Sequence, residues 1–134
     1  MSYPNAVIIA SELRTRQTLS GLLSRLGMTT VGASTVGEAQ AILAWLAASV
    51  IFSAEELADG SFADVLRLSR EERRRVPVIV FSPQADWKGY MRILRAGAFD
   101  CVRYPSAYGE IERVTHNALS YEWPEEPERA APAA

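Results

Sequence analysis

Five short apolar segments, separated by longer stretches of mixed polarity, set the pattern of this chain. Residues 5–10 (NAVIIA) are almost continuously apolar and rich in β-branched side chains, as expected of a strand buried on both faces. Residues 28–33 (MTTVGA) predict a second, weaker strand, and residues 49–53 and 99–103 predict two more. Residues 76–81 (VPVIVF) carry the strongest β signal in the sequence. We therefore predict five strands.

Each predicted strand is followed by a stretch with helical spacing. Between Ser11 and Leu26 leucines recur on one face, and Gly27 follows as a stop signal. Thr35 has Glu38 three residues later, which is a capping box in front of a second helix. Trp45, near its end, is expected to pack between helix and sheet. The turn at 58–60 leads into a third helix carrying Phe62 to Leu68, and two more helices are expected at 84–96 and 106–121.

Five strands alternating with five helices predict an α/β fold with a doubly wound parallel sheet, covered by helices on both faces. For five units of this length the natural strand order is 2-1-3-4-5, the flavodoxin-like (βα)5 arrangement. Ligands of such sheets bind outside the carboxyl ends of the strands. Function is therefore expected at Ala10-Ser11, Ser53-Ala54, Ser82 and Arg103-Tyr104.

The chain has 134 residues, 49% of them hydrophobic, which supports one domain with a substantial core. We assign residues 1–121 to that domain. Residues 122–134, dominated by Pro, Glu and Ala, have too little apolar surface to fold and are expected to be a disordered tail or the start of a linker. No apolar run has the length of a membrane span, and the N-terminus lacks the features of a secretory signal. We expect a cytoplasmic protein that does not bind a membrane.

The few metal-binding and nucleophilic residues limit the chemistry. Cys101 is the single cysteine and His116 the single histidine, which argues against a disulfide, a zinc centre or histidine-dependent catalysis. We expect no metal, no cofactor and no enzyme activity. The net charge of −2 gives no electrostatic footprint for nucleic acid, and the arginines at 73–75 follow two glutamates, as in a solvated helix end.

At this point the segments resemble a response-regulator receiver domain (CheY-like), the phosphorylatable module of two-component signalling. The resemblance covers roughly residues 6–119. It is carried by Ala58-Asp59-Gly60 after the third strand, by VIVFS ending at Ser82, by the run from Arg95 to Asp100 before the fifth strand, and by Tyr104-Pro105 after it.

The resemblance also implies where the phosphorylation site would lie. The family's metal-binding acidic pair falls on Ala10 and Ser11, its phosphoacceptor aspartate on Ala54, and its lysine on Tyr104. The Ser or Thr that ends the fourth strand is kept as Ser82. The family's aromatic switch residue in the fifth strand falls on Cys101.

Together these replacements remove the groups that would bind magnesium and accept the phosphoryl group. Magnesium needs several oxygen ligands in near-octahedral geometry, and methyl groups supply none. Phosphoryl transfer also needs an in-line nucleophile and cations on the equatorial oxygens. We therefore interpret the chain as an atypical pseudo-receiver that is not phosphorylated at the usual site.

Two other functions stay open at this point. Glu12, Glu55 and Glu56 lie next to the lost positions, so a phosphorylatable receiver that binds its metal through displaced Glu12 and Glu55 is one alternative. The other is a flavodoxin-like domain that binds a small ligand at the strand ends. Residues 10–15 contain no glycine to cradle the phosphate of a flavin or nucleotide, which weakens this second alternative.

A surface rich in aromatic residues and arginine points to partner binding. In receivers the helix, strand and helix that correspond to residues 84–96, 99–103 and 106–121 form the usual partner and dimer surface. Side chains of this kind dominate interface energetics. We expect a protein partner or a second copy to bind there. The candidate contact residues are Trp87, Tyr90, Arg95, Arg103 and Tyr108.

Overall fold

The computed structural model describes residues 4–71, 75–83, 86–105 and 108–122. The predicted tail from residue 123 onward lies outside these ranges, as do Gln84 and Ser106, where two helices were expected to begin. The elements in chain order are β1 (Asn5–Ile9), α1 (Leu13–Arg25), β2 (Thr29–Ala33), α2 (Val36–Leu43), β3 (Val50–Ala54), β4 (Glu56–Leu57), β5 (Gly60–Ser61), α3 (Phe62–Glu71), β6 (Val78–Ser82), α4 (Trp87–Ala96), β7 (Asp100–Arg103) and α5 (Tyr108–Ser120).

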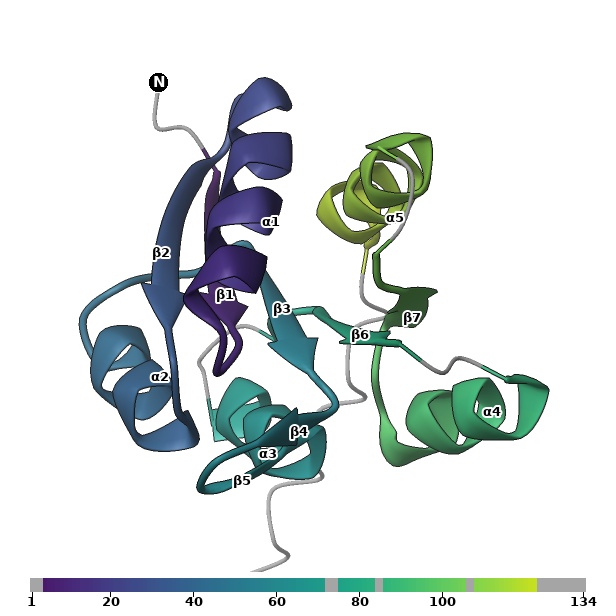
Figure 1. Ribbon diagram of the computed structural model, residues 1–134. Coiled ribbons are helices and arrows are strands. Elements are labelled where there is room, and N and C mark those ends of the chain that lie inside the picture. The colour runs from purple at the N-terminus through teal and green to yellow at the C-terminus, as the bar shows by residue number, and fades with distance from the viewer. Residues whose placement is uncertain (1–3, 72–74, 84–85, 106–107, 123–134) are drawn as a thin grey trace, which may run out of the picture.

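The five long strands form one parallel sheet in the order β2-β1-β3-β6-β7 (Figure 1). With the short hairpin β4–β5 left out of the count, this is the predicted order 2-1-3-4-5. The predicted flavodoxin-like α/β fold is confirmed.

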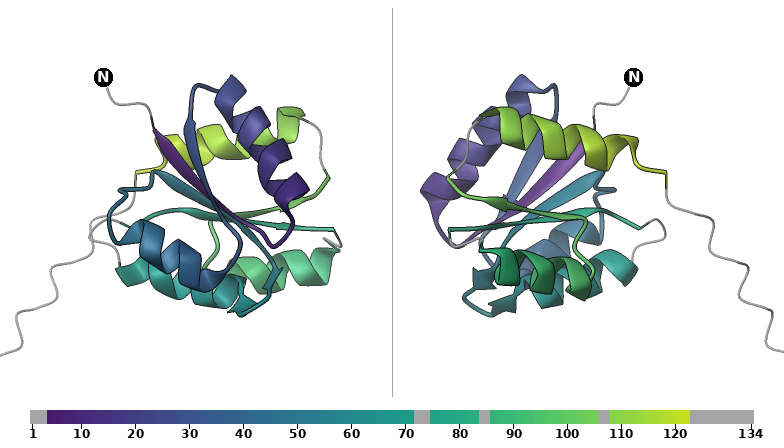
Figure 2. Two further views of the ribbon diagram at one scale, coloured as in Figure 1. Left: turned by 60° about the vertical axis from the view of Figure 1, so that its left-hand side comes forward. Right: turned by 90° about the vertical axis from the view of Figure 1, so that its right-hand side faces the viewer.

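The sheet separates two helical layers, with α1 and α5 on one face and α2, α3 and α4 on the other (Figure 2). Along β1, Ala6 and Ile8 belong to the core beneath α1 and α5, whereas Val7 and Ile9 belong to the opposite core. The central strands β1, β3 and β6 therefore bury both of their faces and are nearly continuous apolar runs, whereas the edge strands β2 and β7 are partly exposed.

The helix ends follow the predicted signals. The Thr35 hydroxyl accepts a hydrogen bond from the amide of Glu38, which confirms the cap of α2. The carboxylate of Asp86 accepts from the amide of Gly89 and begins α4. Gly97 ends α4 in the left-handed conformation, with φ of 116°, which glycine adopts without a steric penalty.

One local expectation is incomplete and another is wrong. The predicted turn is present at Ala58 and Asp59, but it joins the short antiparallel strands β4 and β5, which were not predicted. The Asp59 carboxylate accepts hydrogen bonds from the amides of Val36 and Gly37 (2.8 and 3.0 Å). Trp45 does not pack between helix and sheet. It is 70% exposed and follows the end of α2 at Leu43, whereas the neighbouring Leu46 packs against the core. None of the described helices is long and apolar enough to cross a membrane.

Candidate functional site

The carboxyl ends of β1, β3, β6 and β7 meet around a cavity of about 460 Å³. All five positions predicted for the degenerate phosphorylation site, Ala10, Ser11, Ala54, Ser82 and Tyr104, line this cavity. Parallel strands end at the same edge of a sheet, so residues far apart in sequence gather there. The other lining residues are Glu12, Thr15, Glu55, Glu56, Phe81, Pro83 and Pro105.

The part of the cavity at the ends of β1 and β3 is apolar. Ala10 is only 3% exposed and Ala54 is half-buried, so both present methyl groups where a metal site would need carboxylates. The ring of Tyr104 packs on that of Phe81, with centroids 5.6 Å apart and an angle of 57°. This side of the cavity therefore offers hydrophobic and aromatic contact but no side-chain oxygen from Ala10 or Ala54.

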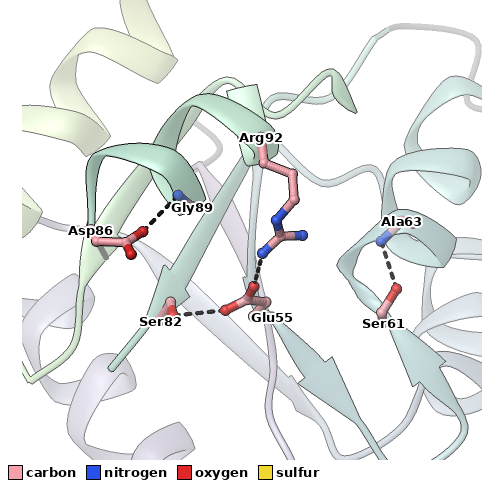
Figure 3. A network of polar contacts seen from close by, with 7 residues as sticks. All are labelled: Glu55, Ser61, Ala63, Ser82, Asp86, Gly89 and Arg92. Atoms are coloured by element: carbon pink, nitrogen blue, oxygen red, sulfur yellow. Dashed lines mark hydrogen bonds and ion pairs between the residues drawn. The ribbon is translucent and has the colours of Figure 1, made fainter. Parts of the chain in front are cut away.

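The side next to β6 and α4 carries a polar network around Glu55 (Figure 3). The Ser82 hydroxyl donates a hydrogen bond of 2.8 Å to one carboxylate oxygen of Glu55. The other oxygen accepts a hydrogen bond from the guanidinium of Arg92, which forms an ion pair with it. Arg92 also lies over the ring of Phe62, 5.8 Å from its centroid. Both oxygens of the half-buried carboxylate are thus occupied by groups of this chain.

We refer to Glu55, Ser82 and Arg92 as the Glu55 network. Arg92 was not predicted to belong to this site. It lies on α4, 37 residues after Glu55, and its contact depends on the reach of one long side chain. No spacing in the sequence signals such a pair.

The donor set does not fit the magnesium ion that the receiver resemblance implies. Glu12 and Glu56 are exposed, while Glu55 is occupied by Arg92 and Ser82. Among the described residues no group of three or more His, Cys, Asp or Glu side chains gathers in a way that could bind a metal. Octahedral coordination at short, fixed distances needs oxygen ligands that converge. The arrangement therefore speaks against metal binding through displaced Glu12 and Glu55.

The aromatic candidates for partner binding fall into two places. Trp87 is 73% exposed at the start of α4 and stacks on Tyr90, with centroids 5.8 Å apart and an angle of 23°. The Tyr90 hydroxyl donates to Asp100 of β7 (3.3 Å), and burial together with that carboxylate raises the pKa of Tyr90. Tyr108 instead lies against α1, with Arg25 4.4 Å from its ring centroid. Arg95 and Arg103 are exposed.

Cys101, at the position of the family's aromatic switch residue, is a buried core residue of β7. Burial, with smaller contributions from Glu55 and Asp100, raises the pKa of its thiol to about 11. The thiol is therefore neutral at physiological pH.

Comparison with known proteins supports the receiver resemblance. No family model matches the chain. Among curated proteins, the response regulator protein PilR of Pseudomonas aeruginosa is 28% identical over 125 residues. That alignment covers 93% of this chain but only 28% of PilR, so the chain spans less than a third of this relative's length.

Solved receiver structures have the same fold. The non-phosphorylated HemR receiver domain from Leptospira biflexa superimposes with a TM-score of 0.77 at 19% identity, over 92% of this chain and 99% of that domain. A receiver domain from Clostridium thermocellum also gives a TM-score of 0.77, at 20% identity, over 87% of this chain and 94% of that chain. A receiver protein from Pseudomonas putida gives 0.76 at 20% identity, over 87% and 98%. The chain has the fold of response-regulator receiver domains.

Proposed function

We propose that this chain is an atypical receiver domain, a pseudo-receiver of two-component signalling that works in the cytoplasm through protein contacts. It is not an enzyme, and it is not phosphorylated at the usual site. The observation that carries this proposal is the strand-end cavity itself. Ala10 and Ala54 occupy its centre, and the half-buried carboxylate of Glu55 is bound by Ser82 and Arg92.

The chemistry of phosphoryl transfer supports this proposal. A carboxylate acceptor must present a free oxygen in line with the phosphorus atom, while cations stabilise the equatorial oxygens. Each oxygen of Glu55 already accepts a hydrogen bond, one from Ser82 and the other from Arg92, and these bonds compete with an attack on phosphorus. Tyr104, at the position of the family's lysine, brings no positive charge.

Partner contact is proposed through α4. The stacked pair of Trp87 and Tyr90 presents a large aromatic surface that is already ordered, since Tyr90 is bonded to Asp100. Ordered aromatic side chains lose little entropy on binding and dominate interface energies. Arg92, also on α4, pairs with Glu55, so an internal ion pair links this helix to the strand-end cavity.

The test of phosphorylation is a mass measurement. The protein is incubated with Mg²⁺ and acetyl phosphate beside a receiver known to accept the phosphoryl group, and both are weighed intact at neutral pH, where an acyl phosphate survives. We expect the mass of the control to rise and that of this chain to stay unchanged. A phosphoryl adduct on Glu12 or Glu55 would overturn the proposal.

The partner surface is tested with two matched tryptophans. Trp87→Ala removes the exposed ring on α4, and Trp45→Ala removes a ring of nearly equal exposure at the end of α2. We expect association, measured by light scattering of the protein alone and by pull-down with candidate signalling partners, to be lost in Trp87→Ala and kept in Trp45→Ala. A monomer at high concentration that retains no partner contradicts this part of the proposal.

A further inference from the structure

We infer that the strand-end cavity binds a small organic cation, an ammonium or guanidinium group carried on an apolar stem. The inference rests on the part of the proposed function that leaves this cavity free of magnesium and of a phosphoryl group. It adds a ligand class to the site, which the receiver resemblance does not provide.

The size of the cavity suits a small molecule. Its volume of about 460 Å³ lies within the range of roughly 300 to 1,000 Å³ found for small-molecule pockets. Three of its lining residues, Ala10, Phe81 and Ser82, are buried, so a ligand in contact with them would be shielded from water. Ser11 and Thr15 add hydroxyl groups near the start of α1.

The walls favour a ligand with an apolar stem. Ala10, Ala54, Pro83 and Pro105 surround the tilted rings of Phe81 and Tyr104, so apolar atoms dominate the lining. Aromatic rings also attract a cation placed over their faces, by about 0.5 to 2 kcal/mol in proteins generally. A stem in contact with these walls would bring its charged end to the rim.

The charged residues that line the cavity favour a positively charged ligand. Three glutamates line the cavity, and none of the described lining residues is Lys, Arg or His. Arg92 balances Glu55, whereas Glu12 and Glu56 make no ion pair within the part of the chain that the structure describes. Glu12 and Glu56 give the rim a negative charge that repels phosphate and attracts a cation, while the nearby guanidinium of Arg16 is held by the carbonyl oxygens of Ala10 and Ser11 (2.6 and 3.2 Å).

An organic cation fits better than a metal ion. A magnesium ion needs converging oxygen ligands; Ala10, Ala54 and Phe81 supply no side-chain oxygen, and the Ser82 hydroxyl is bound to Glu55. An alkyl or arylalkyl ammonium instead keeps its charge near water and the rim carboxylates while its hydrocarbon part covers the apolar part of the lining. The cavity has both regions.

The experiment compares ligands of one size and three charges by amide chemical shifts of ¹⁵N-labelled protein. We expect 2-phenylethylammonium to shift the amides of Ala10, Ala54 and Ser82 with a dissociation constant on the order of 1 mM. The neutral 2-phenylethanol is expected to bind more weakly, and 3-phenylpropionate not at all. Equal or tighter binding of the anion, or shifts confined to α4, would overturn the inference.

Variants at the cavity test whether binding depends on the carboxylates at its rim. Glu12→Gln with Glu56→Gln removes two exposed charges without touching the core, and we expect it to weaken binding of the cation about five- to tenfold. Glu71→Gln, an exposed glutamate at the far end of α3, is the matched control and should change nothing. Tyr104→Lys places an ammonium group of the chain itself at the cavity and is expected to abolish binding. Unchanged affinity in the double variant would contradict the inference.

A negative result is informative by itself. If no shift is seen at a concentration about ten times the expected constant, the cation site is wrong. The pseudo-receiver proposal would still stand on the mass measurement, because that experiment does not depend on any ligand of the cavity.

Discussion

The two sides of the strand-end cavity avoid an unsatisfied buried charge in different ways. At the ends of β1 and β3, alanines leave nothing polar to satisfy. On the side next to β6 and α4, the half-buried carboxylate of Glu55, which follows β3, is satisfied internally by Ser82 and Arg92. Burying a charge is costly unless it is paired and hydrogen-bonded. The comparison teaches that a receiver fold can keep this edge stable without an external ion.

The largest effect is expected from a carboxylate introduced on the apolar side. Ala10→Asp would bury a charge with no facing cation among the lining residues, and we expect the free energy of unfolding to fall by about 3 kcal/mol. Urea denaturation measures it, with Ala47→Asp at an exposed position as the control. A loss below about 1 kcal/mol would mean that this side of the cavity is well solvated.

The second-largest effect is expected when the Glu55 carboxylate, the hydrogen-bond acceptor on the polar side of the cavity, is removed. Glu55→Ala removes the hydrogen bond from Ser82 and the ion pair with Arg92, and we expect a loss of about 1 to 2 kcal/mol in unfolding free energy. Glu55→Gln should cost less, because the amide oxygen still accepts from Ser82. Glu56→Ala, one residue later and exposed, serves as control. Equal losses for Glu55→Ala and Glu56→Ala would show that the Glu55 network does not stabilise the fold.

The hairpin after β3 provides a pH-dependent test of how the loop beside Glu55 is anchored. The amides of Val36 and Gly37 hold the pKa of the Asp59 carboxyl below its usual value of 3.8. Its stabilisation is therefore fully present above that value and is lost as the pH falls through the lower folded-state pKa. We expect Asp59→Asn to lower Tm at neutral pH, and the difference from the unmodified protein to shrink in acid. A difference that stays constant down to about pH 2 would contradict the assignment.

The smallest effect on the free energy of unfolding is expected from replacing Arg92 of the Glu55 network. Arg92 is 58% exposed in its side chain and Glu55 22%, so solvent screens their ion pair. We expect Arg92→Gln to cost about 0.5 kcal/mol, and less at high salt. Arg67→Gln, which breaks the exposed pair with Asp64, is the control and should cost no more. A cost above that of Glu55→Ala would mean that Arg92 acts through its contact with Phe62.

The sheet was predictable because its central strands, β1, β3 and β6, are buried on both faces. Continuous apolar runs such as residues 5–10 and 76–81 marked the strands, and the carboxyl ends of parallel strands must meet. That reasoning predicted that Ala10, Ala54, Ser82 and Tyr104 lie close together, and all four line the cavity. The residues that line the centre of the site therefore followed from backbone topology alone.

The features that were missed depend on side-chain reach or on very short elements. The partner of Glu55 lies on α4 at a separation of 37 residues, where no periodicity connects the two. Two-residue strands such as β4 and β5 carry no alternation that a sequence pattern can reveal. Trp45 follows the last turn of α2, and its apolar character alone does not say on which side of the chain it lies. The role of Trp87 in partner binding stays a prediction.

Cys101 has a practical consequence for measuring these effects. Electrophilic dyes react with thiolates, and this thiol is both enclosed in β7 and protonated at neutral pH. We therefore expect the unmodified chain not to react with thiol-specific labels. A cysteine introduced on α4 or at the cavity rim would carry a fluorophore or spin label alone, without first removing a natural residue from the core.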